Sequence, residues 1–139
     1  MSVDTARTVI ETYYRLFNSG DRAAFLALLA EDVVHDINQG GSESGVAAFA
    51  AFLERMDRCY REEIRDVVVM VNGDGSRAAA EFVVHGTYLS TDEGLPEAVG
   101  QTYVLPAGAF FTLRDGKVAR ISNFYNLPEW TRQVSIPGN

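Results

Sequence analysis

The residues with the clearest chemical potential are a histidine and an aspartate that stand side by side in segment 32–38, which reads DVVHDIN. β-Branched and polar residues are interspersed in this segment, which predicts a short strand. Because strand side chains alternate between two faces, only one of His35 and Asp36 can face an internal pocket. His35 could be a base near neutral pH or a hydrogen-bonded core histidine. Asp36 could be the base, or a carboxylate that faces solvent or caps a turn.

An asparagine near the end of the chain is a second candidate. In segment 118–126, alternation places Ile121, Asn123 and Tyr125 on one face of a predicted strand. If that face is the inner one, the Asn123 amide needs a partner or a ligand, because an unpaired buried amide is costly. If it is the outer face, Asn123 lies in water. Asn38 and Gln39 could border the mouth of a pocket or shape a turn.

The sequence gives less support for a metal site or a cofactor site. His35 and His85, taken with Asp36 and Glu81, lack the short spacing typical of metal motifs, so we expect no metal site. The sequence has no nucleophile elbow, Walker loop or dinucleotide fingerprint, and we expect no cofactor. The acidic segment 92–97 is interpreted as a solvated turn.

Hydrophobic periodicity divides the chain into helices followed by strands. Helices are predicted over 4–18, after Asp21 and over about 46–60, and strands over 32–38, 64–71, 77–88, 101–113 and 118–126. Residues 106–108 (Pro-Ala-Gly) predict a bulge or bend in the long strand 101–113. The tail carries Trp130 without a predicted element, and residues 136–139 are expected to be loose.

This order of elements predicts an α+β fold. Three N-terminal helices would pack on a strongly curved, mixed but mostly antiparallel sheet, forming a cone with an internal pocket. The length of 139 residues predicts a single domain, 1–139, with an ordered core of about 3–132.

The net charge and the cysteine content limit the kinds of binding partner and cellular compartment that we expect. The net charge is −7 and the basic residues form no dense run, so we expect neither nucleic acid nor an anionic membrane as a partner. Cys59 is the one cysteine, which excludes an intrachain disulfide and is compatible with a reducing compartment. The first residues do not read as a secretory signal, and we expect a cytoplasmic protein.

Three stretches carry a family resemblance. YYRLFNSGDRAAFLALLAEDVVHDINQGG, GVAAFAAFLERM and RDGKVARISNFYN together resemble the ketosteroid-isomerase-related, SnoaL-like proteins of the nuclear-transport-factor-two-like superfamily. The resemblance runs from about residue 3 to 130. It implies a cystatin-like α+β roll and cofactor-independent proton transfer, on a scaffold that also serves cyclases, dehydratases, hydrolases and non-catalytic binders.

The resemblance also implies roles for particular residues. The family tyrosine that hydrogen-bonds the enolate oxygen corresponds to Tyr13, seven residues before Gly20. The catalytic aspartate position falls on Ile37, one residue after Asp36, and the protonated acid position falls on Gly108. With no carboxyl at Gly108, we expect weak or no steroid delta-isomerase activity.

Two hypotheses follow. In the first, the protein is an isomerase- or cyclase-like enzyme, or a related hydrolase, that acts on a small hydrophobic carbonyl ligand. His35 or Asp36 would be the base, Tyr13 the main donor, and the ligand-binding residues would be Asn38, Asn123, Tyr125, Ile121, Gly108 and Phe110. In the second, it is a non-catalytic ligand-binding or dimerisation module. In either case we expect a homodimer paired through the outer face of the sheet.

Overall fold

The structure is a computed structural model that describes residues 2–38 and 40–135. The helices are α1 (Val3–Ser19), α2 (Arg22–Ala27), α3 (Val46–Cys59) and α4 (Leu127–Val134), and the strands are β1 (Leu29–Asp36), β2 (Ser42–Ser44), β3 (Tyr60–Val71), β4 (Arg77–Tyr88), β5 (Thr102–Arg114) and β6 (Lys117–Tyr125). Gln39 and the predicted loose end at 136–139 lie outside the described residues.

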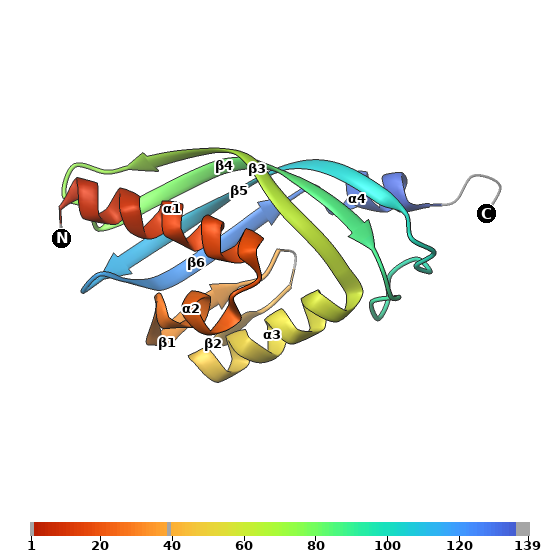
Figure 1. Cartoon of the computed structure of the whole chain (residues 1–139), viewed down its shortest axis with the longest axis horizontal. Coiled ribbons are helices and arrows are strands. Elements are labelled where there is room, and N and C mark those ends of the chain that lie inside the picture. The colour runs from red at the N-terminus through yellow and green to blue at the C-terminus, as the bar shows by residue number, and fades with distance from the viewer. Residues whose placement is uncertain (1, 39, 136–139) are drawn as a thin grey trace.

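One curved sheet forms the frame of the molecule. Its six strands lie in the order β2-β1-β6-β5-β4-β3, with β1 and β6 parallel and the other neighbours antiparallel. α1, α2 and α3 lie on one side of the sheet, and α4 lies at the far end of β5 and β6 (Figure 1). The predicted α+β fold with three N-terminal helices on a mixed, mostly antiparallel sheet is confirmed.

The first two helices begin and end where local chemistry directs them. The Ser2 hydroxyl accepts a hydrogen bond from the backbone N–H of Thr5 at 3.0 Å, which caps α1, and α1 ends at Gly20 with a φ of 77°. Asp21, which directly precedes the second predicted helix, caps α2 by accepting from the N–H of Ala24 at 3.1 Å. These hydrogen bonds fix the N-termini of both helices.

The predicted bulge at residues 106–108 does not form. The β4–β5 register runs unbroken through this segment, and the β3–β4 register shifts instead between Arg65 and Val68. Pro106 is tolerated because the β5–β6 pairing ends at Ala107, which leaves an edge beyond it. The backbone of Val104, two residues earlier on the same edge, pairs with the side chain of Gln133 rather than with a strand.

The tail forms a helix that the periodicity did not predict. Asn126 caps α4 by accepting from the N–H of Glu129 at 3.1 Å, and Pro128 lies in its first turn. Trp130 and Val134 are buried against the end of the sheet. The sequence Asn-Leu-Pro-Glu is an N-cap signal that could have revealed this helix.

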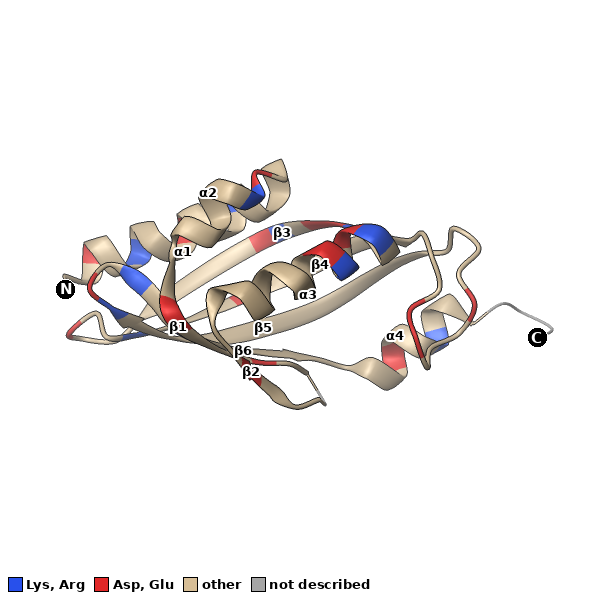
Figure 2. Cartoon of the chain, turned by 90° about the horizontal axis from the view of Figure 1, so that it is seen from below, with Lys and Arg blue, Asp and Glu red and all other residues tan. Residues whose placement is uncertain are grey.

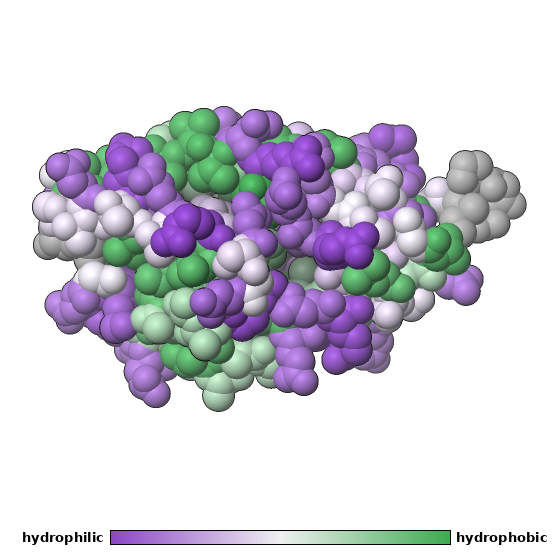
Figure 3. Space-filling view, viewed as in Figure 1, coloured by the Kyte–Doolittle hydropathy of each residue, from purple (hydrophilic) through white to green (hydrophobic). Residues whose placement is uncertain are grey.

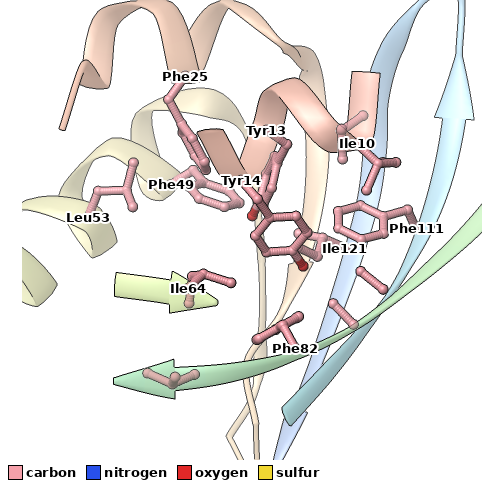
Figure 4. Close-up of a cluster of buried hydrophobic side chains, with 14 of the residues drawn as sticks. Ile10, Tyr13, Tyr14, Phe25, Phe49, Leu53, Ile64, Phe82, Phe111 and Ile121 are labelled. Carbon is pink, nitrogen blue, oxygen red and sulfur yellow. The ribbon is translucent and has the colours of Figure 1, made fainter. Parts of the chain in front are cut away.

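The helices and the inner face of the sheet enclose an aromatic core. Figure 4 shows Tyr13 and Tyr14 of α1 beside Phe25, Phe49, Phe82 and Phe111, which come from four other elements. Tyr13 contacts both Phe25 and Phe111, with ring centroids 4.5 and 5.3 Å apart. This core fills one end of the cone, and the candidate site lies beside it.

Candidate functional site

A buried cavity of about 200 Å³ lies between α1, α3, α4 and the inner face of the sheet. Its walls are mostly aromatic and aliphatic side chains. The polar groups on the walls belong to Tyr13, Tyr14, His35, Asn38, Arg55, Tyr60, Glu62, Asp92, Tyr103, Asn123 and Tyr125. This combination of apolar walls and a few polar groups is typical of small-molecule sites.

His35 faces this cavity from β1 and is only 2% exposed. Its ring stacks on Phe49 at a centroid distance of 4.4 Å and meets the edge of Phe52 at 4.6 Å. Burial lowers the pKa of His35 to about 4, with the nearby Asp36 charge acting weakly in the other direction. His35 is therefore neutral at pH 7.

Asn123 defines the hydrogen bonding of that imidazole. The Asn123 Nδ2 atom lies 3.3 Å from His35 Nε2. An amide NH₂ group can only donate, so Nε2 accepts and the ring proton resides on Nδ1. His35 Nδ1 is buried and has no partner within the described residues. Asn123 therefore lies on the inner face, which is one of the two alternatives that strand alternation left open.

Two adjacent tyrosines of α1 line the same cavity. Burial raises the pKa of both Tyr13 and Tyr14, so each keeps its hydroxyl proton at neutral pH. The Tyr14 hydroxyl is buried without a partner in the described part of the chain, and Figure 4 shows it pointing toward Phe82. Sequence reasoning chose Tyr13 and missed Tyr14, although both belong to the buried stripe of one helix.

The opposite part of the cavity holds an acidic cluster that sequence reasoning also missed. Asp92 accepts a hydrogen bond from the Tyr60 hydroxyl at 2.7 Å and lies 3.7 Å from Arg55. The Tyr103 hydroxyl donates to Glu62 at 2.5 Å. The interpretation of segment 92–97 as a solvated turn is wrong for Asp92, whose side chain is buried. Extending the alternation of β3 back from Ile64 would have placed Glu62 on the inner face.

Asp36 lies on the opposite face of β1 from the cavity. Its carboxylate accepts from the Arg120 Nε at 2.8 Å and from the Ser122 hydroxyl at 2.5 Å. These hydrogen bonds lower the pKa of Asp36, and the one from Ser122 has the largest effect. The structure does not bring Asp36 together with His35 and Tyr13.

Phe110 and Gly108 both occupy outward positions of β5. Phe110 is 59% exposed and contacts Phe124 with a centroid distance of 5.7 Å, so it does not line the cavity. Gly108 borders the cavity and also an open hollow of about 770 Å³ on the outer face of the sheet. The proposed ligand contact of Phe110 is therefore not supported by its position.

The remaining candidates lie on or behind the inner wall. Asn38 accepts from the backbone N–H of Tyr125 at 2.9 Å, while its buried Nδ2 has no partner in the described ranges. Tyr125 reaches the cavity from β6, and burial raises its pKa. Ile121 is fully buried in the core and does not line the cavity.

Charged residues of both signs are scattered over the molecule, with acidic residues in excess (net charge −7). Basic and acidic residues are interspersed in the view of Figure 2, and apolar and polar patches alternate in the view of Figure 3. Within residues 2–38 and 40–135, no three His, Cys, Asp or Glu side chains are grouped closely enough to hold a metal ion. Over the same residues, no helix combines the length and apolar character needed to span a bilayer.

Several solved structures share this architecture. A polyketide-cyclase candidate from Pseudomonas putida is 64% identical, with 94% of this chain and 98% of that chain aligned at a TM-score of 0.93. A polyketide-cyclase candidate from Xanthomonas campestris is 58% identical, with 97% and 100% aligned at a TM-score of 0.94. An epoxide hydrolase from M. tuberculosis has the same fold at 14% identity, with 96% and 92% aligned and a TM-score of 0.72.

No curated protein matches the chain. The family model of the SnoaL-like domain matches residues 10–121, which include the C-terminal part of α1, all of α2 and α3, and strands β1 to β5. The sequence resemblance to SnoaL-like proteins is thereby confirmed. The chain belongs to the SnoaL-like domain family.

Proposed function

We propose that this protein is an enzyme that moves a proton on a small, largely apolar ligand carrying a carbonyl group, as a cyclase or an isomerase does. The proposal rests on three buried groups without partners among the described residues: the Tyr14 hydroxyl, His35 Nδ1 and Asn38 Nδ2. All three can donate a hydrogen bond in the protonation states derived above. A carbonyl oxygen only accepts, so it is the complement of such a cavity wall.

These donors would act most strongly after proton removal. Loss of a proton beside a carbonyl group puts negative charge on its oxygen, and preorganised donors in a dry cavity stabilise that charge by about 3 kcal/mol each. A ligand oxygen that accepts from such a donor recovers the about 1–3 kcal/mol that an unpaired buried polar group costs. Tyr13 lies beside Tyr14 and offers a further hydroxyl at the same wall.

His35 serves as a donor in this proposal, not as the base. Its Nε2 accepts from Asn123, and its Nδ1–H is the group left to face a ligand. A neutral imidazole whose pKa is about 4 is a weak proton acceptor, but it remains a donor over the whole neutral range.

Ligand size and the relatives favour a compact polyketide-like substrate. The cavity of about 200 Å³ is smaller than the ~300 Å³ at which pockets for drug-sized ligands begin, so one or two rings suit it. The relatives at 64% and 58% identity are polyketide-cyclase candidates. In a polyketide a CH₂ group between two carbonyls is an acidic carbon, which suits proton abstraction by a single side chain.

The Tyr14→Phe variant tests the donor wall, which consists of the Tyr14 hydroxyl, His35 Nδ1 and Asn38 Nδ2. We expect wild type to bind 2-naphthol, a two-ring mimic of an enol, and Tyr14→Phe to bind it about 5-fold more weakly, because one neutral hydrogen bond is lost. Fluorescence titration of the naphthol measures the dissociation constants. Naphthalene, which has no oxygen, is the control and should bind both proteins equally. An unchanged naphthol affinity in the variant would contradict the proposed role of Tyr14.

We also propose that a second copy of the chain covers the outer face of the sheet. Apolar side chains point outward there and are at least half exposed: Val68, Met70, Val104, Phe110 and Phe124. We expect light scattering to show a dimer for wild type and a monomer for the double variant Phe110→Ser, Phe124→Ser. Val99→Ser removes an exposed apolar side chain elsewhere and should leave the dimer intact. A monomeric wild type at micromolar concentration would refute this pairing.

A further inference from the structure

The side chain of Glu62 lines the cavity, whereas that of its neighbour Glu63 on β3 is exposed on the outer side. Glu62 shares the inner face of β3 with Tyr60 and Ile64. The Tyr103 hydroxyl donates to its Oε2 atom at 2.5 Å. Its Oε1 atom has no hydrogen-bond partner within residues 2–38 and 40–135. One oxygen is therefore held and the other is free to meet a ligand.

The contact between Tyr103 and Glu62 depends on a glycine in the strand between them. Glu62 pairs with Gly86 of β4, and Gly86 pairs with Tyr103 of β5. A Cβ atom added at Gly86 would lie 2.2 Å from Tyr103 Cζ and 2.4 Å from its hydroxyl oxygen. Such distances are not allowed, so only glycine lets the Tyr103 ring cross β4 to reach Glu62.

We propose that Glu62 is the residue that removes and returns the substrate proton, and that Tyr103, lying over Gly86, positions its carboxylate. This inference rests on the proposed function, because it assigns the base that the donor wall lacks. Asp36 lies on the outer face, and His35 acts as a donor. Both oxygens of Asp92 already accept hydrogen bonds, from the Tyr60 hydroxyl and from the backbone N–H of Glu93. Among the described residues, Glu62 is therefore the cavity carboxylate with a free oxygen.

The step balances without a co-reactant. Glu62 Oε1 takes the proton from the carbon next to the carbonyl, and the C–H electron pair moves to form the enolate, whose oxygen lies at the donor wall. In an isomerisation the protonated Glu62 returns that proton to a different carbon. In a cyclisation the enolate carbon attacks a second carbonyl of the same ligand, and the resulting alkoxide takes the proton from Glu62.

The surroundings of Glu62 suit this task. Burial raises its pKa, and the Tyr103 hydrogen bond acts in the opposite direction. The other polar groups around this part of the cavity are the hydroxyls of Tyr60 and Tyr125 and the paired side chains of Arg55 and Asp92. A carboxylate with a raised pKa is a stronger base than an exposed one.

The test is hydrogen–deuterium exchange at the carbons next to the carbonyl of 2-tetralone, a two-ring ketone, followed by NMR in D₂O. We expect wild type to accelerate the exchange and Glu62→Gln to lose about 100-fold in rate. Gln keeps the size of Glu and can still accept from Tyr103, so the fold is preserved. Glu63→Gln changes the outward neighbour, which pairs with Arg65, and should leave the rate unchanged.

The positioning role of Tyr103 has its own readout. Tyr103→Phe removes a hydrogen bond that stabilises the carboxylate, so the rise of exchange rate with pH should move to higher pH. Gly86→Ala should produce the same shift by displacing the ring. A purely structural role for Tyr103 would lower the rate equally at every pH and would overturn the positioning claim.

The two proposals fail in different ways. If Glu62→Gln exchanges as fast as wild type, Glu62 is not the base, and the donor wall stands on its 2-naphthol affinity. If wild type binds 2-naphthol but does not accelerate exchange, the assignment of Glu62 is overturned and the site binds without proton transfer. If wild type neither binds 2-naphthol nor accelerates exchange, the proposed function and this inference both fall.

Discussion

Replacing Phe111 by Ala should lower the free energy of unfolding by about 3–5 kcal/mol, whereas the same change at its neighbour Phe110 should cost less than about 1 kcal/mol. Phe111 is 2% exposed and Phe110 is 59% exposed, because adjacent residues of β5 point to opposite faces of the sheet. The Phe111 ring meets Tyr13 at 5.3 Å, and its loss leaves a hole beside the cavity.

Urea unfolding at two protein concentrations measures both variants. A concentration-independent loss reports packing within one chain, and a concentration-dependent loss for Phe110→Ala reports pairing between copies. Equal, concentration-independent losses for the two variants would contradict the face assignment of β5, and with it the inner wall of the site.

Acid should destabilise the folded protein through His35. The folded pKa of about 4 lies below the unfolded value of 6.5, so the unfolded chain binds the proton first as the pH falls. The contribution of neutral His35 to the free energy of unfolding is fully present above pH 6.5. It decreases between pH 6.5 and 4 and changes no further below pH 4. The difference corresponds to about 3 kcal/mol.

The matched control for this prediction is the other histidine. Unfolding free energies of wild type, His35→Gln and His85→Gln between pH 7 and 4 should show a shallower decline for His35→Gln alone. His85 lies on the outer side of β4, away from the cavity, and its variant should follow wild type. An identical decline in all three proteins would show that His35 does not remain neutral when folded.

Much of the candidate site followed from strand alternation. The pattern around His35 and Asp36 required them to face opposite sides, and the structure resolves the choice in favour of His35 at the cavity. Alternation likewise grouped Asn123 with Ile121 and Tyr125 on one face of the last strand, and the structure shows that Asn123 and Tyr125 line the cavity. These relations are local, since each depends only on residues within one strand.

The other parts of the site depend on contacts between residues far apart in the sequence, and these could not be predicted. Glu62 and Tyr103 are 41 positions apart and meet only because β3, β4 and β5 align Gly86 between them. The Pro106 bulge was wrongly predicted because the sequence does not reveal that β6 ends its pairing at Ala107. Asp92 resembles a solvated loop residue until Tyr60 and Arg55 are brought beside it.

By itself, the amino-acid order determined the α+β fold, the first three helices and the five longer strands, and which neighbouring residues share a face; it did not reveal β2 or α4. Periodicity and capping are properties of short segments, so they can be seen without the rest of the chain. Only the tertiary structure decided which polar groups are enclosed together, which of them lack partners, and that a carboxylate lies in the same cavity as the donors. Burial and hydrogen-bond satisfaction arise when distant segments exclude water from a shared space, and no local pattern records which segments those will be.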